Sequence, residues 1–163
     1  MEQKILIFKI FFIFFIFFSL IIKAENSNKI LGRAYVIDGD TIHIDNNKIR
    51  LHGIDAPEIK QKCFENGEEW RCGLKSKIAL ENLISNQVVY CETINVDKYR
   101  RFIATCFVNN QNINQHMVVK GWAIAYRYYS KKYVKDEEKA KKNMLGIWIG
   151  KFQEPYLFRK NNN

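Results

Sequence analysis

Acidic residues gather in two short segments of this sequence. The first is Asp38-Gly39-Asp40-Thr41, and the second runs from Arg50 through Asp55 to Glu58. Taken singly, each carboxylate has an ordinary explanation, because Asp caps turns and Gly permits them. Taken together, they supply several oxygen ligands for a cation, and a backbone carbonyl can add another. Calcium prefers such a set of carboxylate and carbonyl oxygens.

Arginines accompany these acids and change the kind of site that the acids predict. Arg50 lies within the second segment, and a basic turn follows at residues 97–101. Hydrolysis of a phosphodiester needs a water nucleophile, a group that orients or deprotonates it, and positive charge at the phosphate oxygens. A cation, a free carboxylate and guanidinium groups meet these needs. A calcium-stabilised adhesion domain, the alternative, would leave the arginines unexplained.

The hydrophobic pattern predicts the strands and helices that must position these residues. Residues 59–71 show no period and are expected to form a loop, and Asp45-Asn46-Asn47 is expected to form a hairpin turn. Strands are predicted at 30–37, 41–44, 48–51, 88–94 and 102–108, and helices at about 74–84, 113–121 and 130–144. This order predicts an α+β fold, a five-stranded OB-fold β-barrel with about three α-helices.

Three motifs in this order resemble the staphylococcal nuclease (thermonuclease) family, exported bacterial type. They are Val36-Ile37-Asp38-Gly39-Asp40-Thr41, Ile49-Arg50-Leu51 through Asp55-Ala56-Pro57-Glu58, and Asp97-Lys98-Tyr99-Arg100-Arg101. Asn114, Lys120-Gly121-Trp122-Ala123 and Gly146-Ile147-Trp148 add to the resemblance, which spans about residues 31–148. The resemblance implies a calcium-dependent nuclease that cuts DNA and RNA with little sequence specificity, leaves 3′-phosphate ends and acts as a monomer.

The resemblance also implies a role for each matching residue. Asp40, Asp55 and the carbonyl of Ala56 would bind calcium, and Asp38 would support them. Glu58 would be the general base or would orient the water. Arg50 and Arg101 would bind the phosphate. The groove for the nucleotides would be lined by Lys98, Tyr99, Tyr126 and Tyr128. The alternative is an OB-fold domain that binds nucleic acid without cutting it, and the retained catalytic set argues against this alternative.

Two positions depart from the family pattern. Ala56 stands where some relatives have threonine, and a carbonyl ligand is available from either residue. Arg100 stands where glycine is common, and glycine allows backbone conformations that arginine resists. Arg100 is therefore an alternative to Arg101 as the phosphate-binding arginine. The match at Tyr126 and Tyr128 needs a gap of one residue after Gly121.

The first 24 residues are interpreted as a signal peptide or as an N-terminal membrane anchor. The apolar run Ile10–Ile22 matches a secretory core in length and is short for a membrane span. An uncleaved anchor over residues 5–22 remains the alternative, and a membrane partner is expected only in that case. We expect a linker at 25–30, the nuclease-like domain at 31–158 and a disordered tail at 159–163.

Charge and cysteine content agree with an exported protein that meets a polyanion. The formal net charge is +9, and removing residues 1–24 takes away Lys4, Lys9, Lys23 and Glu2, which leaves +7. All four cysteines follow the signal, so two disulfides are expected. Of the three possible pairings we favour Cys63–Cys72 and Cys91–Cys106. A zinc site is the alternative, but neither pair has C-x2-C spacing.

Overall fold

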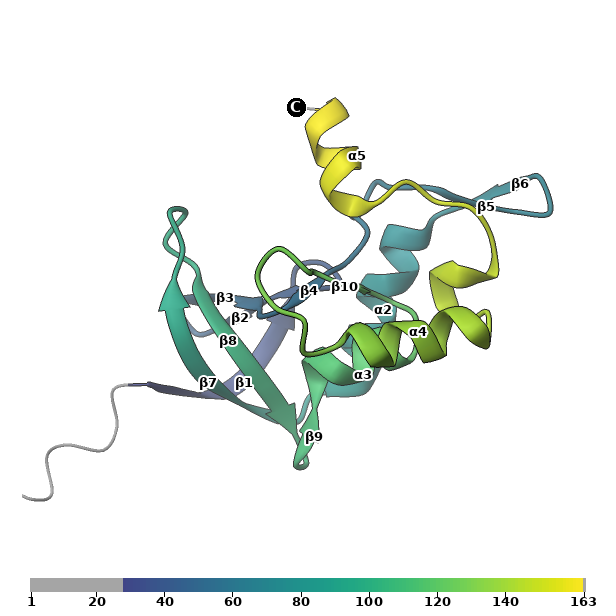
Figure 1. Cartoon of the computed structure of the whole chain (residues 1–163). Coiled ribbons are helices and arrows are strands. Elements are labelled where there is room, and N and C mark those ends of the chain that lie inside the picture. Colours follow the sequence, from purple (N-terminus) through teal and green to yellow (C-terminus); the bar gives the residue numbers. More distant parts are fainter. Residues whose placement is uncertain (1–27, 163) are drawn as a thin grey trace, which may run out of the picture.

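Five strands form a closed barrel in the computed structural model, which describes residues 28–162 (Figure 1). Antiparallel pairing runs in the order β3 (Asn47–Leu51), β2 (Thr41–Ile44), β1 (Lys29–Val36), β7 (Val88–Val96) and β8 (Phe102–Val108). A parallel pairing of β3 with β8 then closes the sheet on itself. The short β9 (Gln111–Asn112) extends β8 by a hairpin. The predicted OB-fold barrel is confirmed.

Helices lie on one side of the barrel and cover its core (Figure 1). They are α2 (Cys72–Ile84), α3 (Ile113–Val119) and α4 (Val134–Lys142), followed by the 3-10 helix η1 (Gly146–Ile149) and α5 (Pro155–Asn162). Inward residues of the strands, such as Ile42, Ile49 and Ala104, are fully buried. Leu80 of α2 and Met117 of α3 join them in one hydrophobic core. In residues 28–162, no helix is long and apolar enough to cross a membrane.

Both predicted disulfides are present. Cys91 and Cys106 lie directly opposite each other on β7 and β8 and are joined inside the barrel. Cys63 and Cys72 close the segment that was expected to be a plain loop. That expectation was wrong in part, because the segment contains a small hairpin of β5 (Cys63–Glu65) and β6 (Glu68–Trp70). Phe64 also pairs with Lys151, which ties this hairpin to the C-terminal part of the chain.

The predicted helix at 130–144 is shorter at both ends. Ser130 is not its N-cap, because the backbone N–H groups of Tyr129 and Ser130 both donate to the carbonyl of Tyr126 in a preceding turn. The helix therefore begins only at Val134. It ends at Lys142, since Met144 adopts a positive φ of 49° that α-helix cannot accommodate.

The two ends of the described chain also differ from the sequence-based expectation. Lys29, assigned to the linker, belongs to β1, as does Ile30, where the predicted linker and the predicted strand overlap; both pair with β7. Residues 159–162, assigned to a disordered tail, form the last turns of α5. Arg159 in this segment forms ion pairs with Asp55 and Glu58, and these contacts hold the end of the helix against the rest of the protein. The proposed signal peptide or anchor over residues 1–24 lies outside the described residues.

A second pair of short strands lies between the barrel and the helices. β4 (Ile54–Asp55) pairs with β10 (Ile124–Ala125), and Asp55 lies opposite Ile124. Neither strand is long enough to produce a recognisable alternation in the sequence. This pairing fixes Asp55 beside β10, and the chain continues from there to Ala56 and Glu58.

Candidate active site

Asp40 is a buried carboxylate immediately before β2. It is 1% exposed. Arg50 and the Thr41 hydroxyl donate to its Oδ1, and the backbone N–H of Ala56 donates to its Oδ2 at 2.7 Å. Asp38, whose Oδ1 accepts the Asp40 N–H at 3.0 Å, holds the turn that precedes it. The acid is therefore positioned from three sides.

Gly39 allows this turn to lie against helix α2. A Cβ atom at residue 39 would lie 2.0 Å from the Ser76 hydroxyl oxygen, so no larger residue fits. The Ser76 hydroxyl itself donates to the carbonyl of Trp122 at 2.7 Å. The glycine in the first motif is thus explained by close packing at this point.

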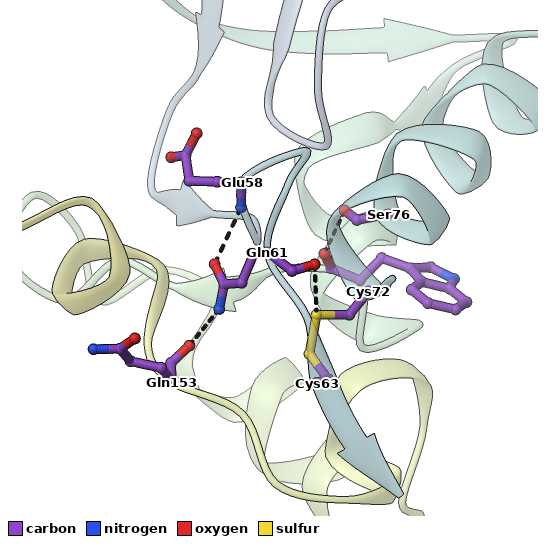
Figure 2. Close-up of a disulfide and its surroundings, with 7 residues drawn as sticks. Glu58, Gln61, Cys63, Cys72, Ser76 and Gln153 are labelled. Carbon is purple, nitrogen blue, oxygen red and sulfur yellow. Dashed lines mark hydrogen bonds between the residues drawn. A yellow bond between two sulfur atoms is a disulfide. The ribbon is translucent and has the colours of Figure 1, made fainter. Parts of the chain in front are cut away.

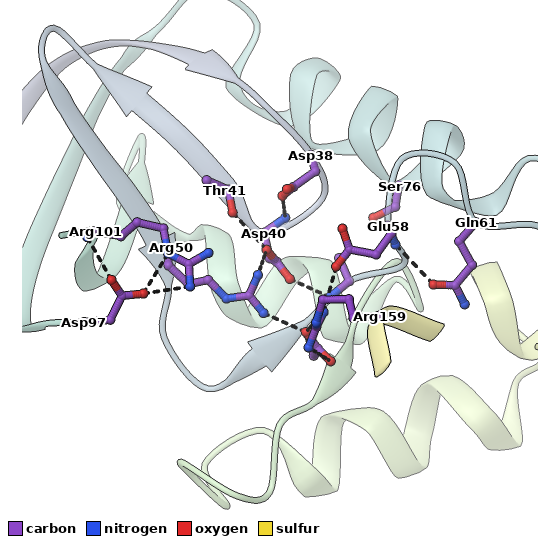
Figure 3. Close-up of polar contacts among 12 residues, drawn as sticks. Asp38, Asp40, Thr41, Arg50, Glu58, Gln61, Ser76, Asp97, Arg101 and Arg159 are labelled. Carbon is purple, nitrogen blue, oxygen red and sulfur yellow. Dashed lines mark hydrogen bonds and ion pairs between the residues drawn. The ribbon is translucent and has the colours of Figure 1, made fainter. Parts of the chain in front are cut away.

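Arg50 joins the two acidic segments. It lies opposite Thr41 in the β2–β3 pairing, so its side chain reaches the start of β2. Its guanidinium group binds Asp40 with one nitrogen and Asp55 with the other, the latter at 2.6 Å (Figure 3). The planar group carries two nitrogens at a fixed spacing, which suits it to hold two carboxylates at once.

The pKa values of the two buried acids are raised, mainly because burial disfavours their charged form. Burial raises the pKa of Asp40 to about 6, although Arg50 opposes this shift. Burial and the nearby Asp40 also raise the pKa of Asp55, against the effect of Arg159 and Arg50. Carboxyl groups with raised pKa values are stabilised by an added cation, because it favours their charged form. Carboxylate oxygens are hard donors, which is the type of ligand that calcium prefers in proteins.

Glu58 lies near Asp55, since Arg159 contacts both acids, and its backbone is held by the disulfide loop, residues 59–72, which the Cys63–Cys72 disulfide closes. Its backbone N–H donates to the Gln61 side chain at 3.2 Å, and that buried side chain donates to the carbonyl of Gln153 at 2.6 Å (Figure 2). Gly73 packs against the backbone here, since a Cβ at this position would lie 1.7 Å from the Glu58 carbonyl oxygen. The Cys63–Cys72 disulfide closes the same loop.

Arg159 is a member of this cluster that sequence reasoning missed. It comes from α5 and donates to Oδ1 of Asp55 at 2.9 Å, to Oδ2 of Asp55 at 3.1 Å and to Oε1 of Glu58 at 2.8 Å (Figure 3). The tail Arg159-Lys160-Asn161-Asn162-Asn163 has no pattern typical of a site. Only the path of the chain brings it to Asp55, which lies far from it in the sequence.

Arg101 lies in a separate ion pair on the β7–β8 turn. Its side chain binds Asp97 at 2.7 Å, and its backbone N–H donates to the same carboxylate. For the part of the chain that the structure describes, no ion pair joins Arg101 to Asp40, Asp55 or Glu58. Figure 3 shows Arg101 and Asp97 beyond Arg50, outside the carboxylate cluster.

Arg100 has the backbone conformation for which glycine is suited. Its φ is +62°, in the left-handed region. Its N–H donates to the carbonyl of Asp97, and the N–H of Asp97 donates to the carbonyl of Arg101, which closes the turn. Arg100 is exposed and Arg101 is half-buried. The turn is therefore closed by backbone hydrogen bonds with arginine in the left-handed conformation.

The aromatic residues predicted to line the groove fall into two groups. Tyr99 is 67% exposed beside Lys98, whose Nζ lies 5.0 Å from the centre of its ring. Tyr126 and Tyr128 lie after β10 in a cluster with Tyr129, which sequence reasoning did not select. Burial and the charge of Asp55 raise the pKa of Tyr126, so this ring lies close to the acidic cluster.

Comparison with known sequences connects this site to one protein family. The family model described as "Staphylococcal nuclease homologue" matches residues 48–150. The matched range contains Arg50, Asp55, Glu58 and Arg101, whereas Asp40 precedes it.

Three relatives have sequences similar to most of this chain. The micrococcal nuclease of Shigella flexneri is 32% identical over 143 residues, which cover 77% of this chain and 77% of the relative. An uncharacterized endonuclease of Haemophilus influenzae is 35% identical, covering 69% of this chain and 62% of the relative. The succinoglycan biosynthesis protein ExoI of Rhizobium meliloti is 38% identical, covering 73% and 64%. The chain thus spans less than two thirds of the last two relatives.

Proposed function

Because this chain belongs to the staphylococcal nuclease family, we propose that it is a calcium-dependent phosphodiesterase that cuts DNA and RNA. The observation that carries the proposal is the group formed by Asp40, Arg50 and Asp55, with Glu58 on the same side of the barrel. The product ends would be 3′-phosphates, as the family resemblance implies.

Asp40, Asp55 and the carbonyl of Ala56 would hold the calcium ion. In residues 28–162, no group of three or more His, Cys, Asp or Glu residues is arranged so that it could hold a metal ion. The proposal therefore relies on two carboxylates and a carbonyl, with water and substrate oxygens completing the shell of six to eight ligands. When bound, calcium supplies a Lewis acid beside the phosphate.

The protein's own side chains would carry the remaining tasks. Glu58 would accept the proton of the attacking water or orient that water. Arg50 and Arg101 would donate hydrogen bonds to the phosphate oxygens as negative charge develops on them. For Arg101 this requires the guanidinium group to turn from Asp97 towards the substrate, since it is paired with that residue here.

Export is the location that this proposal favours. Two disulfides form in the described residues, and stable disulfides are typical of proteins outside the cytoplasm. A signal peptide or an anchor over residues 1–24 would direct the chain there. Sequencing the N-terminus of the exported protein distinguishes these two forms, because cleavage would leave a new terminus near residue 25.

A cleavage assay with a matched pair of variants tests the function. We expect the protein to cut single-stranded DNA and RNA in calcium and to stop in excess EGTA. Asp40→Asn should abolish calcium-dependent cleavage, because it keeps the shape of a buried ligand and removes its charge. Asp45→Asn makes the same change at an exposed turn and should leave the rate unchanged.

Three outcomes of this assay would contradict parts of the proposal. Cleavage by Asp40→Asn at the native rate would exclude the proposed ligand. Cleavage in EGTA would exclude dependence on calcium. Binding of oligonucleotides without any cleavage would instead favour the alternative of an inactive nucleic-acid-binding barrel.

A further inference from the structure

Arg159 binds two of the three acids that the proposed mechanism uses, Asp55 and Glu58, and nothing in the family resemblance assigns it a role. Its Nη1 donates to Asp55 and to Glu58, and its Nη2 donates to the second oxygen of Asp55. The two oxygens of Asp55 are thus bound in a bidentate arrangement. A calcium ion bound to Asp55 would need these same oxygens.

The acceptor positions of the site are almost filled by hydrogen-bond donors. A carboxylate offers about four lone-pair positions. Asp55 accepts three N–H groups, two from Arg159 and one from Arg50. Asp40 also accepts three groups, from Arg50, Thr41 and Ala56. Little of either carboxylate is left for a cation, so a guanidinium group must move before calcium can bind.

Arg159 is better placed to move than Arg50. The Arg50 side chain is 13% exposed and lies on β3, in the wall of the barrel. The Arg159 side chain is 28% exposed and lies near the end of α5, the last helix of the chain. Figure 1 shows α5 standing out from the barrel and the other helices.

The remaining contacts of α5 leave it loosely attached. Pro155 at its start is buried, and the carbonyl of Gln153 just before it accepts a hydrogen bond from Gln61. Further along, Tyr156 and Leu157 are 50% and 43% exposed. The ion pairs of Arg159 are therefore the main polar link between the body of this helix and the active site.

We propose that Arg159 occupies the cation position in the calcium-free protein, so that calcium and helix α5 compete for the carboxylate of Asp55. This inference rests on the proposed calcium dependence. The charges support an exchange of this kind. Three carboxylates, Asp40, Asp55 and Glu58, face two guanidinium groups, and replacing one of these by a divalent cation brings the total charge to zero.

Direct measurement of calcium binding tests the competition without relying on catalysis. Isothermal titration of the full chain with calcium should give about tenfold tighter binding for Arg159→Ala than for the wild type, because the competing group is gone; tenfold is about 1.4 kcal/mol. Lys160→Ala removes an exposed positive charge from the next position of the same helix and should bind calcium as the wild type does.

Hydrogen exchange on the wild-type protein provides a second test that needs no substitution. Calcium should speed the exchange of backbone amides in 155–162, because α5 loses its link to Asp55 and Glu58. Equal or weaker calcium binding by Arg159→Ala would overturn the inference, and so would protection of α5 by calcium. If no variant bound calcium at all, the proposed calcium dependence would itself be wrong.

Discussion

Glu58 differs from the other acids of the site in its surroundings. Asp40 and Asp55 are almost fully buried and share Arg50, whereas the side chain of Glu58 is 32% exposed and forms an ion pair with Arg159. A carboxylate that acts on water needs access to water, and a carboxylate that binds a cation needs fixed oxygens. The burial of each acid therefore agrees with the role proposed for it.

We predict that Glu58→Gln lowers turnover by about 10²-fold or more, the usual scale for the loss of a general base. The amide keeps the shape of the side chain and an oxygen for Arg159, so affinity for a short oligonucleotide should change little. Single-turnover kinetics and a binding assay measure the two effects separately. Glu69→Gln is the control, since Glu69 is exposed on β6; unchanged turnover in Glu58→Gln would exclude the proposed role.

The β7–β8 turn provides a second prediction at the level of single residues. A residue with a side chain costs roughly 1–2 kcal/mol in the left-handed region that Arg100 adopts. Arg100→Gly should therefore raise the free energy of unfolding by about 1 kcal/mol, as measured by urea denaturation. It should also retain activity, whereas Arg101→Ala should slow turnover strongly. The opposite result, in which Arg100→Gly is inactive and Arg101→Ala remains active, would identify Arg100 as the phosphate-binding arginine.

The two disulfides act on different elements. Cys91–Cys106 joins two strands that are already paired by the backbone of the barrel. Cys63–Cys72 closes the loop that leads from Glu58 into α2, where the N–H of Gly73 donates to the carbonyl of Gln61 at 3.2 Å. One disulfide thus supports the barrel and the other supports the loop that follows Glu58.

Replacing each cysteine pair by serine should separate these effects. The chain-entropy estimate for loops with sequence separations of 9 and 15 is roughly 3 kcal/mol in each case, so both double variants should melt at lower temperature. At a temperature where both remain folded, only Cys63→Ser with Cys72→Ser should lose turnover. Equal turnover in the two double variants would show that the loop is positioned without its disulfide.

The whole molecule carries an excess of positive charge, with 26 Lys and Arg against 17 Asp and Glu. Such a balance favours a polyanionic substrate, because cationic side chains release counterions from the phosphates that they contact. Lys98 is an exposed member of this set, next to Tyr99 on the β7–β8 turn. Binding of nucleic acid should therefore weaken as salt is added.

We predict that Lys98→Ala lowers the slope of this salt dependence by roughly 0.7, the value for one phosphate contact on a single strand. The affinity for a single-stranded oligonucleotide, measured by fluorescence anisotropy over a range of salt concentrations, gives the slope. Lys142→Ala on α4 serves as a control for the loss of one exposed charge. A slope that is the same in the wild type and in Lys98→Ala would exclude a phosphate contact by this lysine.

Sequence patterns alone predicted the barrel and the family, and they favoured the cysteine pairing that the structure shows. Local patterns are enough for these features: β-branched residues alternate along the strands, and the acidic motifs stand in a fixed order. The three helices of the body were also predicted in their correct places, although α4 proved shorter. Helix propensity does not reveal the turn at residues 126–130 that precedes α4. Because of this turn, the helix begins at Val134 and not at Ser130.

Which charged groups come into contact depends on the tertiary structure. Arg159 lies about a hundred positions from Asp55 in the sequence and binds it because the chain returns across the disulfide loop, where Lys151 pairs with Phe64. Arg101 was expected among the acids but binds Asp97, its neighbour in the turn. Ion pairs depend on distances in space, and contacts between distant parts of a chain leave no periodic pattern in its sequence.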